Sequence, residues 1–265
     1  MLLLALAALP LALAAHGQPA ATNASVIVLF LPFAAVGVLI AYRQPRNSIG
    51  WILVTLALTV TLATDASVYA VLVYRVGDHG LPLGRLAVAL APSWIPVLAL
   101  LPLPVMLFPD GRIPGGRWRW CFWAYVVVVG TFLVVNAIPD STAFTDHRLI
   151  VGSNGEAAAL TAPSSRAAAI LTGVIVGAYV AVFLAAAARQ IDRYRRASGD
   201  ERQQLKWFLT GGTVAVVGVL LASVVGGPAS PAFVAVSALP LGIGMGVLKY
   251  RLYDVDRLIS RTLSY

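Results

Sequence analysis

The stretch that decides the fold runs from Ser25 to Ala70 and reads SVIVLFLPFAAVGVLIAYRQPRNSIGWILVTLALTVTLATDASVYA. It holds two apolar blocks separated by a short polar segment, and each block approaches the roughly 20 residues that a membrane-crossing helix needs. Over the whole chain, 59% of residues are hydrophobic and only 11% are charged. Long apolar blocks with so few charges are typical of membrane proteins. We therefore expect an all-α, polytopic transmembrane helix bundle and exclude a soluble fold.

Eight apolar segments are long enough to be considered as spans. They cover residues 1–15, 25–42, 49–70, 86–108, 119–138, 166–188, 207–226 and 231–248. The first is short, and Ala12-Leu13-Ala14 resembles a signal-peptidase site, although no Lys or Arg precedes the apolar run. Two alternatives follow: a bundle of eight spans, or seven spans after a cleaved signal.

The basic residues indicate the orientation, because positively charged short loops stay in the cytoplasm. One set of alternate loops holds 15 of the 19 Lys and Arg: residues 43, 46, 112, 117, 119, 189, 193, 195, 196, 202, 206, 249, 251, 257 and 261. We therefore expect a multi-pass protein of the plasma membrane with a cytoplasmic carboxyl end, and with both ends cytoplasmic if the first span is retained. The net charge of +8 is then explained by membrane topology. We expect the lipid bilayer as a partner and no nucleic acid.

Two features inside the apolar blocks are candidate sensing elements. Asp65 is the one acid within an apolar block, and an intramembrane carboxylate is a functional hypothesis by default. The plainer interpretation ends the helix at Thr64 and leaves Asp65 in water. The span 86–108 contains several prolines, so it must kink or break. Pro92, Trp94 and Pro96 could line a cavity at that break, although prolines are also tolerated in membrane helices for structural reasons.

Small residues indicate where helices approach closely. Gly173, Gly177, Ala181 and Ala185 recur every four residues in the span 166–188, which suits either packing within the bundle or contact with a second copy in a homodimer. Gly242, Gly244 and Gly246 soften the last span just before it reaches the cytoplasm. A hinge at these glycines would transmit movement, while ordinary tolerance of glycine in membranes explains them equally well.

We divide the chain into a bundle, residues 1–248, and a cytoplasmic connector, residues 249–265. The connector has Leu252, Val255, Ile259 and Leu263 on one helical face. An amphipathic helix continuing a membrane span suits mechanical transmission. The alternative is a helix lying on anionic lipid.

No enzyme signature occurs in the sequence. A Gly-rich phosphate loop, a HExxH pair and a GxSxG elbow are all missing. The single cysteine, Cys121, excludes a Cys-based zinc cluster. The sequence therefore nominates no catalytic, cofactor-binding or metal-binding residue, and we expect no cofactor.

Four segments on the basic side carry a family resemblance. They are Arg43-Gln44-Pro45-Arg46-Asn47-Ser48-Ile49-Gly50-Trp51, Leu107-Phe108-Pro109-Asp110-Gly111-Arg112, Glu201-Arg202-Gln203-Gln204-Leu205-Lys206-Trp207, and Tyr250-Arg251-Leu252-Tyr253-Asp254-Val255-Asp256-Arg257-Leu258-Ile259-Ser260-Arg261-Thr262-Leu263. Together they resemble the membrane input region of bacterial two-component sensor histidine kinases. In that family the last motif leads into a further helix, a dimerising phosphoacceptor helix pair and an ATP-binding domain.

The resemblance implies a sensory input domain whose output is a cytoplasmic kinase and response regulator downstream. The chain ends at Tyr265 without a kinase domain, so kinase activity is expected only if such a domain follows. Two other functions remain open on the residues alone. A small-molecule transporter or channel would use Asp65 and the proline-broken helix as its substrate site, and a membrane scaffold would only dock a cytoplasmic partner.

Overall fold

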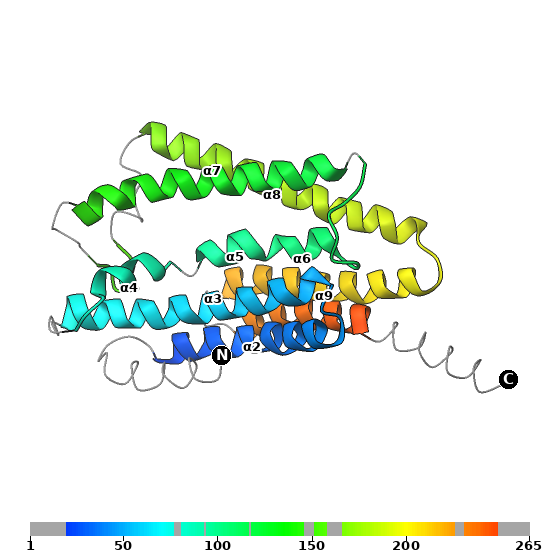
Figure 1. Ribbon diagram of the computed structural model, residues 1–265, viewed down its shortest axis with the longest axis horizontal. Helices are drawn as coiled ribbons and strands as arrows, with labels where there is room; N and C mark the ends of the chain where they lie inside the picture. The colour runs from blue at the N-terminus through cyan, green and yellow to red at the C-terminus, as the bar shows by residue number, and fades with distance from the viewer. Residues whose placement is uncertain are drawn as a thin grey trace. The chain divides into compact units, whose positions relative to one another are not determined.

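The computed structural model describes residues 20–76, 81–92, 94–116, 118–145, 151–157, 166–225 and 231–248. Helices make up nearly all of this described part of the chain (Figure 1). Two predicted segments lie outside it: the first span, 1–15, and the connector 249–265 with Leu252, Val255, Ile259 and Leu263. Most of the predicted outer loop 139–165 also lies outside it.

The elements follow one another without strands in the described ranges. In chain order they are α2 (Ala20–Arg43), α3 (Ser48–Val71), a π-helical turn (Leu72–Val76), α4 (Gly84–Leu90), α5 (Trp94–Leu100), α6 (Pro102–Leu107), α7 (Trp118–Thr145), α8 (Arg166–Arg196), α9 (Gly199–Val225) and a 3₁₀ turn (Pro231–Ser237). The 3₁₀ turn leads into the last apolar helix, which ends at Leu248. The all-α prediction is confirmed for these residues.

Several helices are long and apolar enough to cross a membrane. Four helices are each long and apolar enough individually: Ser48–Val76, Trp118–Val135, Ala169–Arg196 and Gly199–Ala222. The bent pair Gly84–Leu90 and Trp94–Leu107 makes a fifth if it is one span. Leu29–Arg43 and Val234–Leu248 are shorter apolar helices. The chain therefore has the helices of a membrane protein.

The predicted break in the span 86–108 is confirmed. The span divides into α4, α5 and α6, with interruptions at residues 91–92 and at Leu101. Pro92 and Pro102 stand at these two interruptions, and a proline has neither the N–H nor the room that a continuous helix requires. The backbone breaks where the prolines predict it, because a proline disrupts only its own part of a helix.

Contacts divide the chain into two compact units. Unit 1 comprises residues 1–27, 58–99 and 115–185, and unit 2 comprises residues 28–57, 100–114 and 186–265. In unit 1, Ala66 and Ala70 of α3 pack with Ala87 and Val88 of α4, and the turn 151–157 adds Val151 and Ala157 to this cluster. The turn fits because Gly155 passes over the backbone of Ser67, where a side chain would collide.

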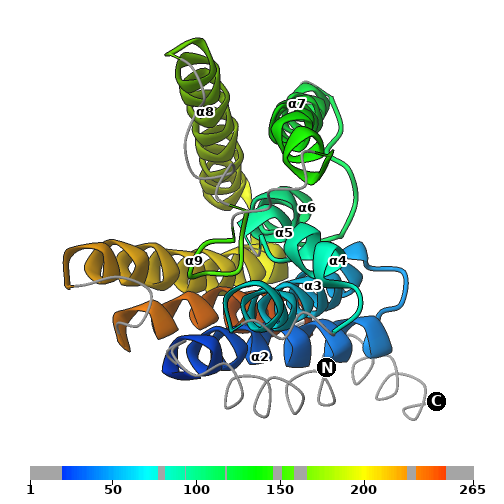
Figure 2. The same ribbon diagram turned by 90° about the vertical axis from the view of Figure 1, so that its left-hand side faces the viewer.

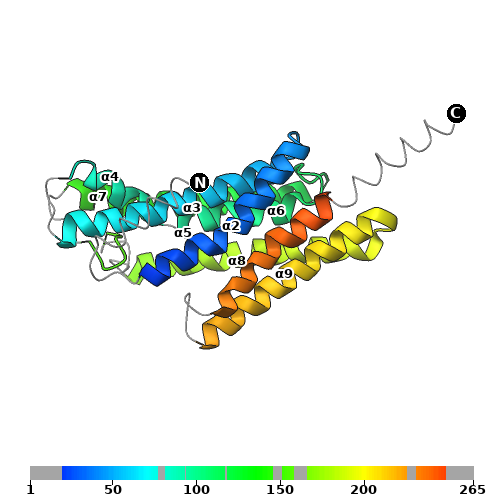
Figure 3. The same cartoon turned by 90° about the horizontal axis from the view of Figure 1, so that it is seen from below.

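In unit 2, the last helix packs against both α9 and α2 (Figures 2 and 3). Gly242 lies against Gly211 of α9 so closely that a Cβ on Gly242 would be only 3.1 Å from the Cα of Gly211. Gly244 faces the side chain of Val36 on α2. Small residues thus set the spacing of these helices, as expected for packing in lipid, where close backbone approach replaces the hydrophobic effect.

Candidate functional site: the Arg193 cluster

The site begins with carbonyl groups that prolines leave without partners. In an α-helix each carbonyl accepts from the N–H four residues later, and Pro109 has no N–H to offer to the carbonyl of Val105. Helix α6 also ends at Leu107, so its last carbonyls lie where a helix has no internal donors. Other parts of the chain must therefore supply the donors.

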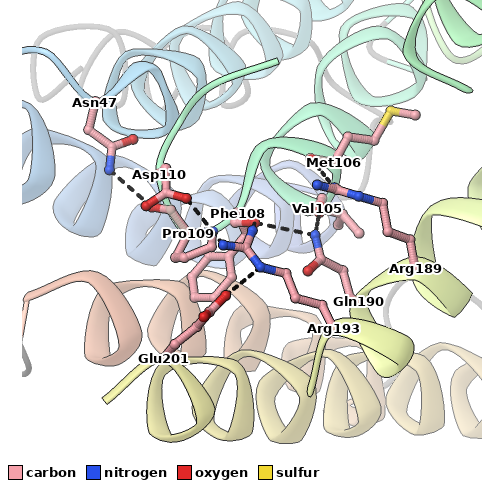
Figure 4. Close-up of polar contacts among 10 residues, drawn as sticks. All are labelled: Asn47, Val105, Met106, Phe108, Pro109, Asp110, Arg189, Gln190, Arg193 and Glu201. Atoms are coloured by element: carbon pink, nitrogen blue, oxygen red, sulfur yellow. Dashed lines mark hydrogen bonds and ion pairs between the residues drawn. The ribbon is translucent and has the colours of Figure 1, made fainter. Parts of the chain in front are cut away.

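Helix α8 supplies them from one face. The Nε2 of Gln190 donates to the carbonyl of Val105 at 2.5 Å and lies 3.4 Å from that of Phe108. The Nη1 of Arg189 donates to the carbonyl of Met106 at 2.9 Å. Figure 4 shows these side chains pointing from α8 toward the end of α6. Cations at the carboxyl end of a helix also interact favourably with its dipole.

Arg193 joins three segments of unit 2. Its Nε donates to Oε1 of Glu201 at 2.6 Å, its Nη2 lies 3.3 Å from Oδ2 of Asp110, and its Nη1 donates to the carbonyl of Phe108 at 3.2 Å. We call Arg189, Gln190, Arg193, Asp110 and Glu201 the Arg193 cluster. The carboxylates of Asp110 and Glu201 are about half exposed, so these ion pairs orient the segments more than they stabilise them.

The segment 109–111 is also tied to the start of α3. Asn47 caps that helix, because its Oδ1 accepts from the N–H of Ile49 at 3.1 Å, while its Nδ2 donates to the carbonyl of Pro109 at 3.3 Å. Ser48 donates through Oγ to the carbonyl of Gly111 at 2.6 Å. Gly111 has φ of 69°, and a side chain there would run into Asn47. Only glycine suits this turn.

The last helix joins the same region through a ring stack and a hydrogen bond. Phe108 stacks on Phe208 of α9 with 4.5 Å between ring centroids. Gly246 makes room for this stack, because a Cβ there would lie 2.8 Å from Phe108. The Nε2 of Gln44, at the end of α2, donates to the carbonyl of Val247 at 3.1 Å. Three of the four sequence motifs therefore meet beside the last helix.

A polar cavity of about 440 Å³ opens at this end of unit 2. Its lining comes from three chain segments and the last helix: Arg43, Gln44, Pro45, Arg46, Asn47, Pro109, Asp110, Arg112, Gln204 and Val247. Three arginines and one carboxylate make the lining positive overall.

Asp65 lies in a different environment, in unit 1. Helix α3 continues to Val71 and only then changes to the π-helical turn. Asp65 is 7% exposed, and neither of its carboxylate oxygens has a hydrogen-bond partner among the residues that the structure describes. The interpretation that ended the helix at Thr64 and left Asp65 in water is therefore wrong, since tertiary packing buries this turn.

The residues of the proline break have surroundings of their own. Pro92 lies in the interruption after α4, and Pro96 lies inside α5. Trp94 packs edge-on against Phe132 of α7, with ring centroids 5.5 Å apart. Farther along, Pro102 leaves the carbonyl of Leu98 without a helical donor, and the hydroxyls of Tyr125 and Tyr179 approach it at 3.0 and 3.2 Å. Side-chain hydroxyls here replace the backbone donor that a proline lacks.

The glycines separate into two groups. Gly242, Gly244 and Gly246 are all close-packed, because a Cβ on any of them would lie 2.9 Å or less from a neighbouring atom. Close approach therefore accounts for their identity, and the hinge remains a prediction. For Gly173 and Gly177, a Cβ would meet no atom of the described residues within 4 Å. Among these residues the two glycines make no close contact within the bundle, and contact with a second copy stays a prediction.

Sequence reasoning missed the Arg193 cluster, because it interpreted these arginines only as topology signals. The available signal was their spacing: residues 189, 190 and 193 share one face of a helix, and acids precede and follow them at Asp110 and Glu201. Among the described residues, no group of three or more His, Cys, Asp or Glu is arranged to hold a metal ion. Comparison with protein-family models, with curated proteins and with solved structures gives no match.

Proposed function

We propose that this chain is the membrane-embedded sensory input domain of a two-component histidine kinase. It would cross the plasma membrane eight times, with the arginine-rich loops and both ends in the cytoplasm. The observation that carries the proposal is the meeting of segments 43–51, 107–112 and 201–207 beside the last helix in unit 2. A site that ties three chain segments to the helix leading to the connector suits transmission of a shift.

The proposed mechanism needs two packings of the bundle that differ by a few kcal/mol. A stimulus acting at Asp65, or at the proline break with Pro92, Trp94 and Pro96, would favour one packing. The last helix would adjust at Gly242, Gly244 and Gly246. The connector would carry the change onward through the face formed by Leu252, Val255, Ile259 and Leu263.

The proposal includes a homodimer. Gly173 and Gly177 lie on an exposed part of α8, together with large exposed side chains such as Val174, which is 63% exposed. A ridge of small residues without a partner among the described residues of its own chain suits contact with a second copy in lipid. The cytoplasmic partner would be a kinase domain and its response regulator.

The test is a chimera in which residue 265 is joined to the cytoplasmic core of a known histidine kinase. Insertion of one to seven residues after Leu248 rotates the connector relative to the bundle by about 100° per residue. We expect autophosphorylation to rise and fall with the helical period. A flat response, with every chimera inserted in the membrane, would contradict the proposal.

One observation favours a second candidate, a transporter or channel. A buried carboxylate with no partner in the described residues, as at Asp65, is a common feature of substrate and ion pathways. This candidate predicts flux through proteoliposomes that contain the chain alone, abolished by Asp65→Asn. The sensor proposal predicts no such flux.

A further inference from the structure

We propose that the polar cavity of unit 2 binds a phosphate group, presented either by an anionic lipid headgroup or by a small soluble phosphate ester. This inference goes beyond the proposed signalling role and does not depend on it. The cavity brings together Arg43, the last residue of α2, Arg46, from the loop between α2 and α3, and Arg112, from the loop after α6. Arg112 is more than sixty positions from the other two in the sequence, so only folding brings them together.

The described residues leave the charges in the cavity without compensating partners. Asp110 is the one carboxylate in the lining, and Arg193 already binds it at 3.3 Å. In the part of the chain that the structure describes, no ion pair engages Arg43, Arg46 or Arg112. Gathering three cations around a concave surface raises their mutual repulsion, which a bound anion would relieve.

The chemistry of the lining suits phosphate. Guanidinium groups present planar pairs of donors that match phosphate oxygens. The walls are held in place, because Asn47 and Gln44 are both hydrogen-bonded to other segments, at Pro109 and Val247. The N-terminus of α3 follows directly after Asn47, and its dipole adds positive potential. A volume of about 440 Å³ is in the range of small-ligand sites.

Topology alone does not account for this arrangement. The positive-inside rule requires arginines in a loop but no particular grouping of them. Arg119 and Arg195 satisfy the rule as exposed side chains outside the cavity lining. They therefore provide a matched control, since their replacement removes the same net charge.

The experiment uses the full chain and two probes. In the first arm, protein in a non-ionic detergent is titrated with inorganic phosphate at constant ionic strength, and affinity is measured by calorimetry. In the second arm, protein is reconstituted in nanodiscs of phosphatidylcholine with or without phosphatidic acid, and its melting temperature is compared. Three proteins are tested: the wild type, the double variant Arg46→Gln/Arg112→Gln, and the control Arg119→Gln/Arg195→Gln.

We expect the cavity variant to bind at least about tenfold more weakly than the wild type, since two charge-assisted contacts are lost. The control should stay within about twofold, because neither of its arginines lines the cavity. A response to phosphatidic acid alone identifies a lipid headgroup as the source, and a response to inorganic phosphate alone identifies a soluble ester. Equal losses in both variants, or no response of the wild type in either arm, would overturn the proposal. Arg43→Gln repeats the test if the double variant does not fold.

Discussion

Two buried polar regions of this protein differ in how far their polar atoms are paired. In the Arg193 cluster, Gln190 is completely buried and its amide nitrogen contacts two carbonyls, while its Oε1 has no hydrogen-bond partner among the described residues. Asp65 is almost as buried, and both of its oxygens lack a hydrogen-bond partner among the described residues. Burying a polar group costs free energy unless it is hydrogen-bonded. The first region therefore holds the fold together, and the second lowers its stability.

The difference separates two kinds of candidate site. Paired groups such as Arg193 position chain segments, and their loss changes geometry. An unpaired buried carboxylate remains ready for a proton, a cation or a moving donor, which is why Asp65 stays the stronger sensing candidate. Substitutions in each region test this difference.

The largest effect is expected from Gln190→Met, which keeps the volume and removes the donor. The carbonyl of Val105 would lose its partner while Pro109 still offers no N–H, so we expect a loss of about 2 kcal/mol in the free energy of unfolding. The measurement is unfolding in detergent followed by circular dichroism. Gln203→Met, at an exposed position of α9, should change stability by less than about 0.5 kcal/mol. Equal effects of the two variants would mean that Gln190 is not a structural donor.

A smaller effect of opposite sign is expected from Asp65→Asn. Removing a carboxyl group that is buried without a partner should raise the free energy of unfolding by about 1 kcal/mol. Asp200→Asn is the matched control: Asp200 lies in the first turn of α9, where a negative charge favours the helix, so its loss should destabilise slightly. Destabilisation by Asp65→Asn would show that Asp65 has a partner in the folded protein.

The smallest effect is expected at Glu156, whose carboxyl group is partly buried and accepts one hydrogen bond. Burial raises the pKa of this carboxyl, while a hydrogen bond from Asn154 at 3.0 Å acts in the opposite direction. The folded protein therefore holds the proton more tightly than the unfolded chain. Its contribution to stability is present below the unfolded pKa and is lost as the pH rises through the folded pKa.

Glu156→Gln should remove that pH dependence. Across the acidic window between the unfolded and folded pKa values, the wild type should lose stability relative to the variant by no more than about 0.5 kcal/mol. Melting temperatures of both proteins at a series of acidic pH values provide the measurement. Parallel profiles would show that Glu156 titrates alike in the folded and unfolded states.

Much of the helical pattern could be predicted, because it depends on local features. The segment 49–70 corresponds to α3, and 166–188 falls within α8, although α8 continues to Arg196. Ser198 followed three residues later by Glu201 has the pattern of a capping box, and α9 begins at Gly199. In the structure, Oε1 of Glu201 binds Arg193. The long-range ion pair with Arg193 competes with a local cap, and the spacing of residues along the sequence does not reveal it.

The sequence by itself determined the apolar helices, the division of basic residues between alternate loops and the break at Pro92 and Pro102. Each follows from hydropathy or from the missing N–H of proline, which act over one or two turns of chain. Tertiary packing accounts for three other features: Asp65 is buried, Arg193 joins Asp110 to Glu201, and a Cβ on Gly173 or Gly177 would meet no atom of the described residues within 4 Å. These depend on contacts between distant segments, and a single sequence carries no direct record of them.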